Sequence, residues 1–450
     1  LAPRVIQAGG HRLVAATARA AIAGGPYPET EVWAYNGTVP GPLLRVKRGA
    51  TLKVTLENQV TDATSIHWHG IRLPNAMDGV PHLTQEPVGR GESFVYEFAA
   101  DDSGTFWYHP HWKSYEQVER GLYGALIVEE DAPPEVDRDI VWILDDWRLT
   151  AEARIAGDFA NLFDVSHAGR LGNTVTVNGR IAEEFRVRHG ERIRLRLVNA
   201  ANARIFGLRF DVLSPWLIAT GGHATVPNPM GSGNRLVLGP GMRADLIVDC
   251  VGIAGERVTI ADDFYPRQAY RLLDVVYGDE PPVREKVPRT PIALAPNALP
   301  EPDPAKAERI AIKFGGGAMS RLAEAEFQGR TRPMREIFTQ HRMAWAINGR
   351  VVGEHDHAPM LNLKRGRSYI FAMENDTAWH HPIHLHGHAF QVIARDGARP
   401  PRIMWRDTVL MNPRERVDIA FVADNPGDWM FHCHILEHQA GGMMAALRVE

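Results

Sequence analysis

Short segments in which apolar and polar residues alternate recur along the whole chain. Examples are residues 52–56 (Leu-Lys-Val-Thr-Leu), 193–197 (Ile-Arg-Leu-Arg-Leu) and 417–421 (Val-Asp-Ile-Ala-Phe). Because successive side chains of a strand point to opposite faces, this pattern is typical of strands. Glycine and proline separate the segments, and the best of the few helical candidates is residues 320–327. The pattern predicts a mostly β protein.

A longer pattern occurs three times along the chain. An Asn-Gly turn, a strand, a glycine and a second strand ending in asparagine follow one another from Asn36, from Asn178 and from Asn348. In each copy the glycine precedes the final asparagine by nine residues, at 49 and 58, 190 and 199, and 366 and 375. Fixed offsets of this kind are typical of repeated structural units. The sequence therefore predicts three related domains.

The length of 450 residues suits three domains, because single domains commonly contain about 100 to 150 residues. Proline is frequent near residues 132–134 and at residues 281–304, and we interpret the second segment as a linker. The predicted domains are residues 1–132, 133–300 and 301–450.

Composition excludes some classes of function. Hydrophobic residues make up 44% and charged residues 23% of the chain, as in ordinary globular proteins. The net charge is -4 and no run of lysine and arginine occurs, so nucleic acid is not an expected partner. No apolar stretch reaches the roughly 18 residues of a membrane span. Composition does not indicate an oligomeric state.

Histidines separated by one residue lie at matching positions in the first and third copies. Residues 67–70 read His-Trp-His-Gly and residues 384–387 read His-Leu-His-Gly, each nine residues after the repeated asparagine. Near the end of each copy, residues 104–111 (Gly-Thr-Phe-Trp-Tyr-His-Pro-His) match residues 427–434 (Gly-Asp-Trp-Met-Phe-His-Cys-His). The second copy has Leu-Arg-Phe at residues 208–210, so only the outer domains carry such pairs.

A single pair of this kind is weak evidence, because 20 histidines in 450 residues give about one by chance. We interpret His355 and His357 as a chance pair in a surface loop. The four matched pairs differ, because residues two apart in a strand share a face. If the outer domains meet around a pseudo-twofold axis, eight imidazoles converge between them: His67, His69, His109, His111, His384, His386, His432 and His434.

Eight imidazoles suit three metal ions and leave room for an oxygen ligand. A shell of imidazoles without carboxylates favours copper over magnesium, calcium or a carboxylate-bridged pair of irons. The sequence therefore predicts a cluster of three copper ions.

Cys433 lies between His432 and His434, where it suits a metal better than a disulfide. In an extended segment its side chain points away from those of its two neighbours. The side chain of His381 also lies on the opposite face from that of His384, because the two are three residues apart. Cys433 and His381 are therefore expected to serve a second site.

Two histidines, a cysteine thiolate and a weak axial methionine are the ligands of a blue electron-transfer copper. Zinc is the alternative for this site alone. The short backbone links from the cysteine to its neighbouring histidines would connect the two sites. Cys250 ends an apolar run and is interpreted as an inert buried thiol. The predicted ligands of the second site are His381, Cys433, His438 and Met443.

The four histidine segments resemble the copper signatures of the multicopper oxidases, the family of laccases, ascorbate oxidase and bacterial cuprous oxidases. The resemblance follows the chain in domain order and implies an all-β fold of three consecutive cupredoxin-like Greek-key β-sandwich domains. It also implies four copper ions, one of type 1, one of type 2 and two of type 3. The implied ligands are His67 and His384 for type 2; His69, His109 and His434 for one type 3 copper; His111, His386 and His432 for the other; and His381, Cys433, His438 and Met443 for type 1.

Reduction of O2 to water consumes protons, so a carboxylate near the cluster is required as a relay. Asp78 is the candidate, since bacterial members of the family carry an acid at its position, and a simple turn-forming aspartate is the alternative. Many relatives have a second acid just after the position of His438, where this chain has Gln439. The resemblance further implies that electrons enter at His438.

The favoured hypothesis is a laccase-like oxidase that takes electrons from phenols, aromatic amines or metal ions and passes them to O2. Met443 should lower the type 1 potential and favour easily oxidised donors. A periplasmic cuprous oxidase is the second hypothesis, although no methionine-rich insertion occurs, and Met319, Met334 and Met343 are interpreted as packing or loop residues.

A copper nitrite reductase is disfavoured, because it would not need four histidine pairs. A non-enzymatic division-type scaffold is disfavoured because all the copper residues are present. We expect a periplasmic or secreted protein whose leader is absent from a chain that begins at Leu1.

Overall fold

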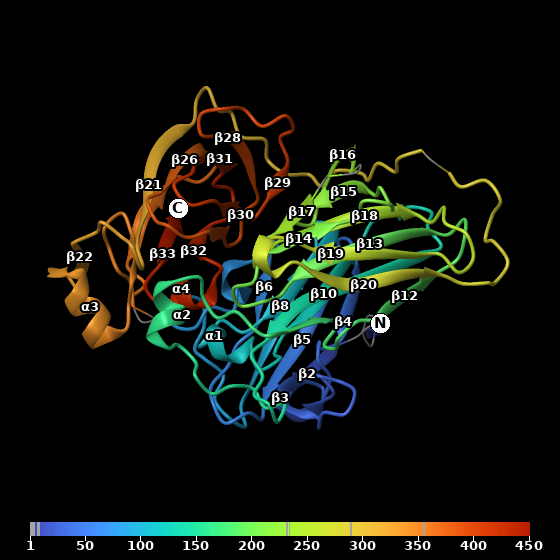
Figure 1. Ribbon diagram of the computed structural model, residues 1–450. Helices are drawn as coiled ribbons and strands as arrows, with labels where there is room; N and C mark the ends of the chain where they lie inside the picture. Colours follow the sequence, from blue (N-terminus) through green and yellow to red (C-terminus); the bar gives the residue numbers. More distant parts are fainter. Residues whose placement is uncertain (1–4, 7–9, 231–232, 234, 289, 354–355) are drawn as a thin grey trace.

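The computed structural model describes residues 5–6, 10–230, 233, 235–288, 290–353 and 356–450, and strands dominate them (Figure 1). They form three successive pairs of sheets, here called the first, middle and third sandwiches. No helix in this described part is long and apolar enough to cross a membrane. The helices are α1 (Ser114–Gln117), α2 (Leu162–Ser166), α3 (Met334–His341) and α4 (Leu436–Ala440), with short 3-10 helices η1 (Asn75–Met77) and η2 (Pro266–Gln268).

The first sandwich contains a five-stranded and a four-stranded sheet, and buried side chains from both sheets, such as Leu44 and Leu52, pack in one hydrophobic cluster. The five-stranded sheet has the order β1 (Val5–Ile6), β4 (Leu43–Lys47), β9 (Gly124–Glu129), β8 (Gly104–His109) and β6 (His67–His69). The four-stranded sheet has the order β3 (Thr30–Tyr35), β2 (His11–Ala20), β5 (Thr51–Asn58) and β7 (Ser93–Ala99).

The middle sandwich has its own hydrophobic core between a six-stranded and a five-stranded sheet. The larger sheet has the order β11 (Thr174–Val177), β10 (Arg138–Trp147), β13 (Arg192–Asn199), β18 (Arg243–Asp249), β15 (Trp216–Thr220) and β16 (His223–Pro229). The other has the order β12 (Glu184–Val187), β20 (Tyr270–Tyr277), β19 (Arg257–Asp262), β14 (Phe206–Arg209) and β17 (Arg235–Leu238).

The third sandwich repeats this plan and adds a hairpin of β22 (Glu324–Phe327) and β23 (Arg330–Pro333). Its larger sheet has the order β24 (Trp345–Ile347), β21 (Glu308–Gly316), β26 (Ser368–Asn375), β31 (Arg416–Val422), β28 (Phe390–Arg395) and β29 (Trp405–Arg406). The other sheet has the order β25 (Pro359–Leu363), β33 (Met444–Val449), β32 (Gly427–Cys433), β27 (His381–Leu385) and β30 (Thr408–Met411).

The three Asn-Gly turns form equivalent structures. Asn36, Asn178 and Asn348 have φ values of 54°, 53° and 50°, and the glycine after each also has a positive φ. Asparagine and glycine tolerate this conformation, which a tight turn of this hand requires. The side-chain oxygen of each asparagine accepts a hydrogen bond from strand β2, β10 or β21, at the backbone N–H groups of Val14, Ile143 and Lys313. The predicted repeat is confirmed.

The second repeated asparagine positions the histidine segments. Asn58, Asn199 and Asn375 are buried at the ends of β5, β13 and β26. Each donates two hydrogen bonds of 2.7 to 2.8 Å to backbone oxygens, one of which belongs to the loop that leads toward the next strand. These buried bonds fix the loops before His67 and His384.

The helical prediction for residues 320–327 is wrong. The second half of this segment is strand β22, in which Ala325 and Phe327 are buried and the two glutamates are exposed. This alternation has the period of a strand. Gln328 and Gly329 follow with φ values of 52° and 70°, which form the tight turn to β23. The helix of this region is α3.

The proline-rich segment 281–304 contains no helix or strand in its described part, and it connects β20 to β21. It follows the surface of the other sandwiches. Asn297 exchanges hydrogen bonds with Ser103 of the first sandwich and lies 3.0 Å from the His223 ring of the middle one. The segment therefore contacts both units that precede it.

Candidate metal centres

The predicted histidines lie on equivalent strand pairs of the first and third sandwiches. In the first, β6 pairs with β8 and places His67 opposite His109. In the third, β27 pairs with β32 and places His384 opposite His432. The second histidine of each pair lies two residues further along the chain. The two sandwiches therefore present similar sets of imidazoles to each other.

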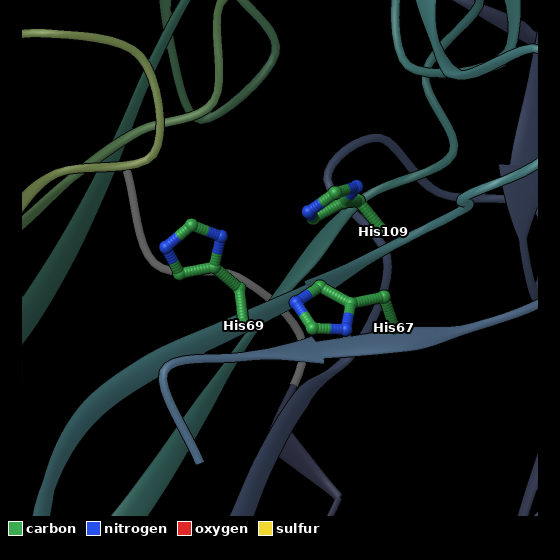
Figure 2. A group of neighbouring side chains, drawn as sticks. All are labelled: His67, His69 and His109. Carbon is green, nitrogen blue, oxygen red and sulfur yellow. The ribbon is translucent and has the colours of Figure 1, made fainter. Parts of the chain in front are cut away.

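The eight imidazoles are buried, and rings from the two sandwiches meet. His67 stacks on His386 with ring centroids 3.9 Å apart, and His69 stacks on His384 at 3.8 Å. The ligand atoms of several groups of three lie within 4.8 Å of one another. Figure 2 shows one group from the first sandwich, with its rings pointing toward one another: His67, His69 and His109.

Other groups combine both sandwiches. His67 lies with His384 and His386, and His111 lies with His386 and His432, in each case with ligand atoms within 4.8 Å. His386 and His432 direct their Nε2 atoms at each other at 3.0 Å. The His434 ring is centred 4.9 Å from that of His69 and 5.2 Å from that of His109. The structure thus brings all eight predicted imidazoles together.

Hydrogen bonds fix which ring nitrogen is free. The Nδ1 atoms of His67 and His384 lie 2.9 and 2.8 Å from backbone oxygens, so Nδ1 carries the proton and Nε2 keeps its lone pair. A buried polar atom without a partner is costly, and a metal ion would satisfy such a lone pair. Within the cluster, buried Nε2 atoms without a hydrogen-bond partner among the described residues occur on His67, His109, His111, His384 and His434. The imidazoles therefore fit copper ions.

His69 faces the cluster through its other nitrogen. Its Nε2 lies 3.1 Å from the carboxylate of Asp407 and 3.0 Å from the Thr408 hydroxyl. Because a carboxylate only accepts, Nε2 carries the proton, and the buried Nδ1 has no hydrogen-bond partner among the described residues. Asp407 also belongs to a group of possible metal-binding atoms with His69 and His384. The sequence analysis missed Asp407, because it lies outside the matched histidine segments.

Arg243 of the middle sandwich holds Asp407 in place. Its two terminal nitrogens lie 2.7 and 2.6 Å from the two carboxylate oxygens, and both side chains are buried. The middle sandwich also approaches the cluster through Gly241. A Cβ atom there would lie 2.8 Å from His69 and 2.9 Å from His434, so only glycine fits. The middle sandwich thus contacts the histidine cluster although it carries none of the predicted histidines.

Asp78 lies against the cluster, as its predicted role requires. Its side chain is 1% exposed, and Oδ2 accepts a hydrogen bond of 2.8 Å from Nδ1 of His386. Its Oδ1 lies 3.3 Å from Nδ1 of His67. The turn is fixed by Gly79, where a Cβ would lie 1.8 Å from the Ile66 carbonyl oxygen.

Gln439 occupies the position of the expected second acid. Its side-chain amide lies 3.5 Å from Nδ1 of His111, and its Oε1 has no partner within the described part of the chain. If the amide is turned over, Nδ1–H of His111 can donate to Oε1, and Nε2 of His111 keeps its lone pair for the cluster, as in His67 and His384. A cavity of about 230 Å³ reaches this point and is lined by His111 and Gln439. Solvent thus has a route toward His111.

The second predicted site lies around Cys433. The Sγ atom is 3.5 Å from Nδ1 of His381 and 3.7 Å from Nδ1 of His438, and these two nitrogens are 3.1 Å apart. The other ring nitrogens are held by the Thr377 hydroxyl at 2.8 Å and by the backbone oxygen of His167 at 2.7 Å. Met443 is also buried, and its carbonyl accepts a hydrogen bond from the Cys433 backbone N–H.

Burial shifts the protonation of both centres. It lowers the pKa of His432 to about 4 and that of His438 to about 3, from an ordinary value of 6.5. Burial, then His384 and then Arg243 hold the pKa of His69 well below that value. Neutral imidazoles are the form that binds metal ions. Burial also raises the pKa of the Cys433 thiol, so a metal cation has to stabilise the thiolate.

The remaining predicted residues lie away from these centres. Cys250 is a free, buried thiol whose pKa burial raises to about 12, as expected for an inert residue. Met334 and Met343 pack against a small cluster beside α3, whereas Met319 is exposed in a loop, as predicted. The pair of His355 and His357 is described only in part, because His355 lies outside the described residues.

Comparisons with known proteins agree with this geometry. Two family models described as multicopper oxidase match residues 16–133 and 328–450. The crystal structure of a multi-copper oxidase from Pseudomonas thermotolerans is 33% identical, with a TM-score of 0.85 over 99% of this chain and 100% of that one. The multicopper oxidase MmcO of Mycobacterium tuberculosis is 29% identical over 94% of this chain and 84% of its own length.

A third relative is CueO, a bacterial laccase-like multi-copper oxidase from the lignin-degrading bacterium Ochrobactrum sp., with oxidase activity towards lignin model compounds and lignosulfonate. It is 27% identical, with a TM-score of 0.82 and coverage of 100% of both chains. The chain belongs to the multicopper oxidase family of O2-reducing oxidoreductases. Within that family it has the organisation of the three-domain bacterial laccase-like members, so the three sandwiches are cupredoxin domains and the buried histidine and cysteine clusters are copper sites.

Proposed function

We propose that the protein is a laccase-like oxidase that takes single electrons from phenols or related aromatic donors and reduces O2 to two waters. The observation that carries this proposal is the buried set of eight imidazoles beside Cys433, whose sequence neighbours His432 and His434 belong to that set. Bound copper would supply one-electron chemistry at the cysteine site and four-electron O2 reduction at the histidine cluster. The aromatic donor class is supported by the relative from Ochrobactrum, which has oxidase activity towards lignin model compounds.

We propose four copper ions, with ligands that follow the motif positions. The free ring nitrogens support this assignment, since the buried lone pairs face the same space. Within the eight-histidine cluster, His69 would bind through Nδ1, whereas His67 and His384 would bind through Nε2. The proposed ligands are His67 and His384 for type 2; His69, His109 and His434 for one type 3 copper; His111, His386 and His432 for the other; and His381, Cys433, His438 and Met443 for type 1.

Each proposed domain has a distinct part in this function. We take residues 1–132 and 301–450 as the domains that enclose the three-copper cluster and residues 133–300 as the domain without copper ligands. The pairing of β6 with β8 and of β27 with β32 supports this division. Cys433 lies between two histidines of the cluster, and this gives electrons a short covalent path.

Asp78 is proposed as the proton relay of O2 reduction. Its carboxylate is buried and accepts a hydrogen bond from Nδ1 of His386, so it lies next to the cluster. A carboxylate there can take up a proton and release it to reduced oxygen. Gln439 cannot do so, and the cavity at His111 is the other route by which protons in water approach.

The test is O2 uptake by copper-loaded protein with 2,6-dimethoxyphenol and with Cu(I), measured side by side. We expect the higher kcat/KM with the phenol. A higher value with Cu(I) would favour a cuprous oxidase, and no uptake with either donor would indicate a protein of this fold without oxidase activity. The Cys433→Ser variant serves as the control, since loss of the thiolate should stop electron entry from either donor.

A further inference from the structure

The histidine cluster meets solvent at one of its ligands. Seven of its eight histidines are 0 to 1% exposed, whereas His111, which lines the cavity of about 230 Å³, is 6% exposed. Copper ions have to pass into this buried cluster when the protein is loaded. An ion that enters through the cavity therefore meets His111 first.

The same cavity is lined by three of the chain's 13 methionines, Met343, Met430 and Met444. Met430 and Met444 are buried and pack in one small apolar cluster with Val80 and Val352. Met343 is half-buried and follows α3. The described lining contains methionine, histidine and glutamine side chains but no carboxylate. Thioether sulfur suits the soft Cu(I) ion, whereas carboxylates suit hard cations.

Strand pairing places two of these methionines beside a ligand of the cluster. Met430 is two residues from His432 in β32, so their side chains share one face of the sheet. Met444 of β33 lies directly opposite His432 in the antiparallel pair. Cross-strand neighbours of this kind also share a face. Both thioethers therefore lie on the face that carries an imidazole of the cluster.

The charged side chains of the lining do not exclude a cation. Lys113 is paired with Asp62 at 2.7 Å, and Arg342 is exposed, so that solvent screens its charge. Beside His111 the lining carries the neutral amide of Gln439. The described part of the cavity thus offers soft donors without an unpaired buried charge.

We infer that this cavity binds Cu(I) through the sulfurs of Met343, Met430 and Met444 and is the route by which the histidine cluster is loaded with copper. The ion moves as Cu(I) without a change of oxidation state. Its bonds to thioether sulfur break as bonds to imidazole nitrogen form, first at His111. The inference rests on the proposed copper ligands, because the route ends at them.

The rate of copper uptake tests the route. Copper-free protein would be mixed under argon with tetrakis(acetonitrile)copper(I), quenched at intervals with the chelator bathocuproine disulfonate and then exposed to O2. The blue absorption reports filling of the type 1 site, and the type 2 electron paramagnetic resonance signal reports filling of the cluster. We expect Met343→Leu/Met430→Leu/Met444→Leu, which keeps side-chain volume, to fill the cluster about tenfold more slowly, equivalent to about 1.4 kcal/mol of lost soft-ligand binding. Filling of the type 1 site should keep its rate.

Met373→Leu is the matched control, because Met373 is a buried residue of β26 that is not among the described residues of the cavity lining. Met343→Leu alone changes only a half-buried side chain and should slow cluster filling by a smaller factor. Equal rates of cluster filling in the triple variant and in Met373→Leu would overturn the route. Wild-type protein that fills the type 1 site but never the cluster would contradict the proposed cluster ligands together with the route.

A binding measurement on the loaded enzyme tests the Cu(I) site itself. Copper-loaded protein with isotope-labelled methionine methyl groups would be reduced with dithionite, desalted under argon and titrated with one equivalent of the same Cu(I) salt. All the copper is then diamagnetic, so NMR can follow each methyl group. We expect the methyl signals of Met343, Met430 and Met444 to shift and that of Met373 to stay in place. Unchanged signals from the three cavity methionines, or shifts confined to other methionines, would overturn the Cu(I) site.

Discussion

Replacing Arg243 with methionine would leave the Asp407 carboxylate buried without its charged partner. The two side chains are 0% and 2% exposed and are joined by hydrogen bonds of 2.7 and 2.6 Å. Removing one partner of such a pair costs about 3 to 5 kcal/mol, because the remaining charge keeps its desolvation penalty. Since Thr408 and His69 can still donate to Asp407, we expect the free energy of unfolding to fall by about 3 kcal/mol. This corresponds to a Tm lower by about 6 to 12 °C for a folding unit of roughly 150 to 250 residues.

Chelator-treated protein is the suitable sample, since bound copper would add its own stabilisation. Urea unfolding would be followed by tryptophan fluorescence and by far-ultraviolet circular dichroism. The two unfolding curves must coincide, because a single free energy of unfolding applies to a three-domain protein only if all the domains unfold together. Arg448→Met is the matched control. Its pair with Asp428 has hydrogen bonds of 2.7 and 2.8 Å but side chains 44% and 26% exposed, so we expect a loss below about 1 kcal/mol.

The double variant Arg243→Met/Asp407→Leu tests the physical reason. With both charges replaced by apolar side chains, no buried charge remains, and most of the lost stability should return. The reasoning is refuted if Arg243→Met is no less stable than Arg448→Met, or if the double variant is less stable than the single one.

Other variants test the two centres. Cys433→Ser should remove the intense blue absorption of copper-loaded protein, and a blue variant would exclude Cys433 as a type 1 ligand. Asp78→Asn should slow O2 reduction about 100-fold in stopped-flow experiments, because it cannot carry a proton, while the type 1 site stays reducible; unchanged turnover would remove its relay role. His67→Ala should lose the type 2 electron paramagnetic resonance signal and O2 turnover. Copper-free protein should lose stability as the pH falls below 6.5, because these histidines bind protons in the unfolded chain before they do so in the folded one. The loss should continue down to the folded-state pKa values, about 4 for His432 and about 3 for His438, and each histidine adds a slope of about 1.4 kcal/mol per pH unit. A urea midpoint that does not change with pH in this range would contradict the prediction.

The repeat and the histidine positions were predictable because they depend on local geometry. Asn36 and its two counterparts occupy a left-handed turn that few residues tolerate, so the motif is visible in each copy. Residues two apart share one face of a strand, which made the convergence of four pairs predictable. The assignment of Cys433 to a separate site followed from the same alternation, and the structure places its sulfur near His381 and His438.

Contacts between distant segments were not predictable in the same way. Asp407 and Arg243 are 164 residues apart, and each is one polar residue in or beside a strand. His69 turns Nδ1 toward the cluster because its Nε2 is bonded to Asp407, so this orientation could not be predicted from the sequence either. The helix predicted at residues 320–327 failed because the alternating burial of Ala325 and Phe327 against α3 outweighs the helical propensity of alanine and glutamate.

The middle sandwich carries none of the proposed copper ligands, yet it contacts both centres through backbone groups and a charged side chain. At the cluster it contributes bare backbone at Gly241 and a fixed positive charge at Arg243, which helps to keep His69 neutral and therefore able to bind metal. At the cysteine site it contributes the His167 carbonyl, which holds the outer nitrogen of His438. A cluster built at the junction of two domains has ligands whose relative position depends on how those domains meet. A third domain that packs against rings from both sides restricts that position, so a copy without ligands can still be needed for the geometry of the copper sites.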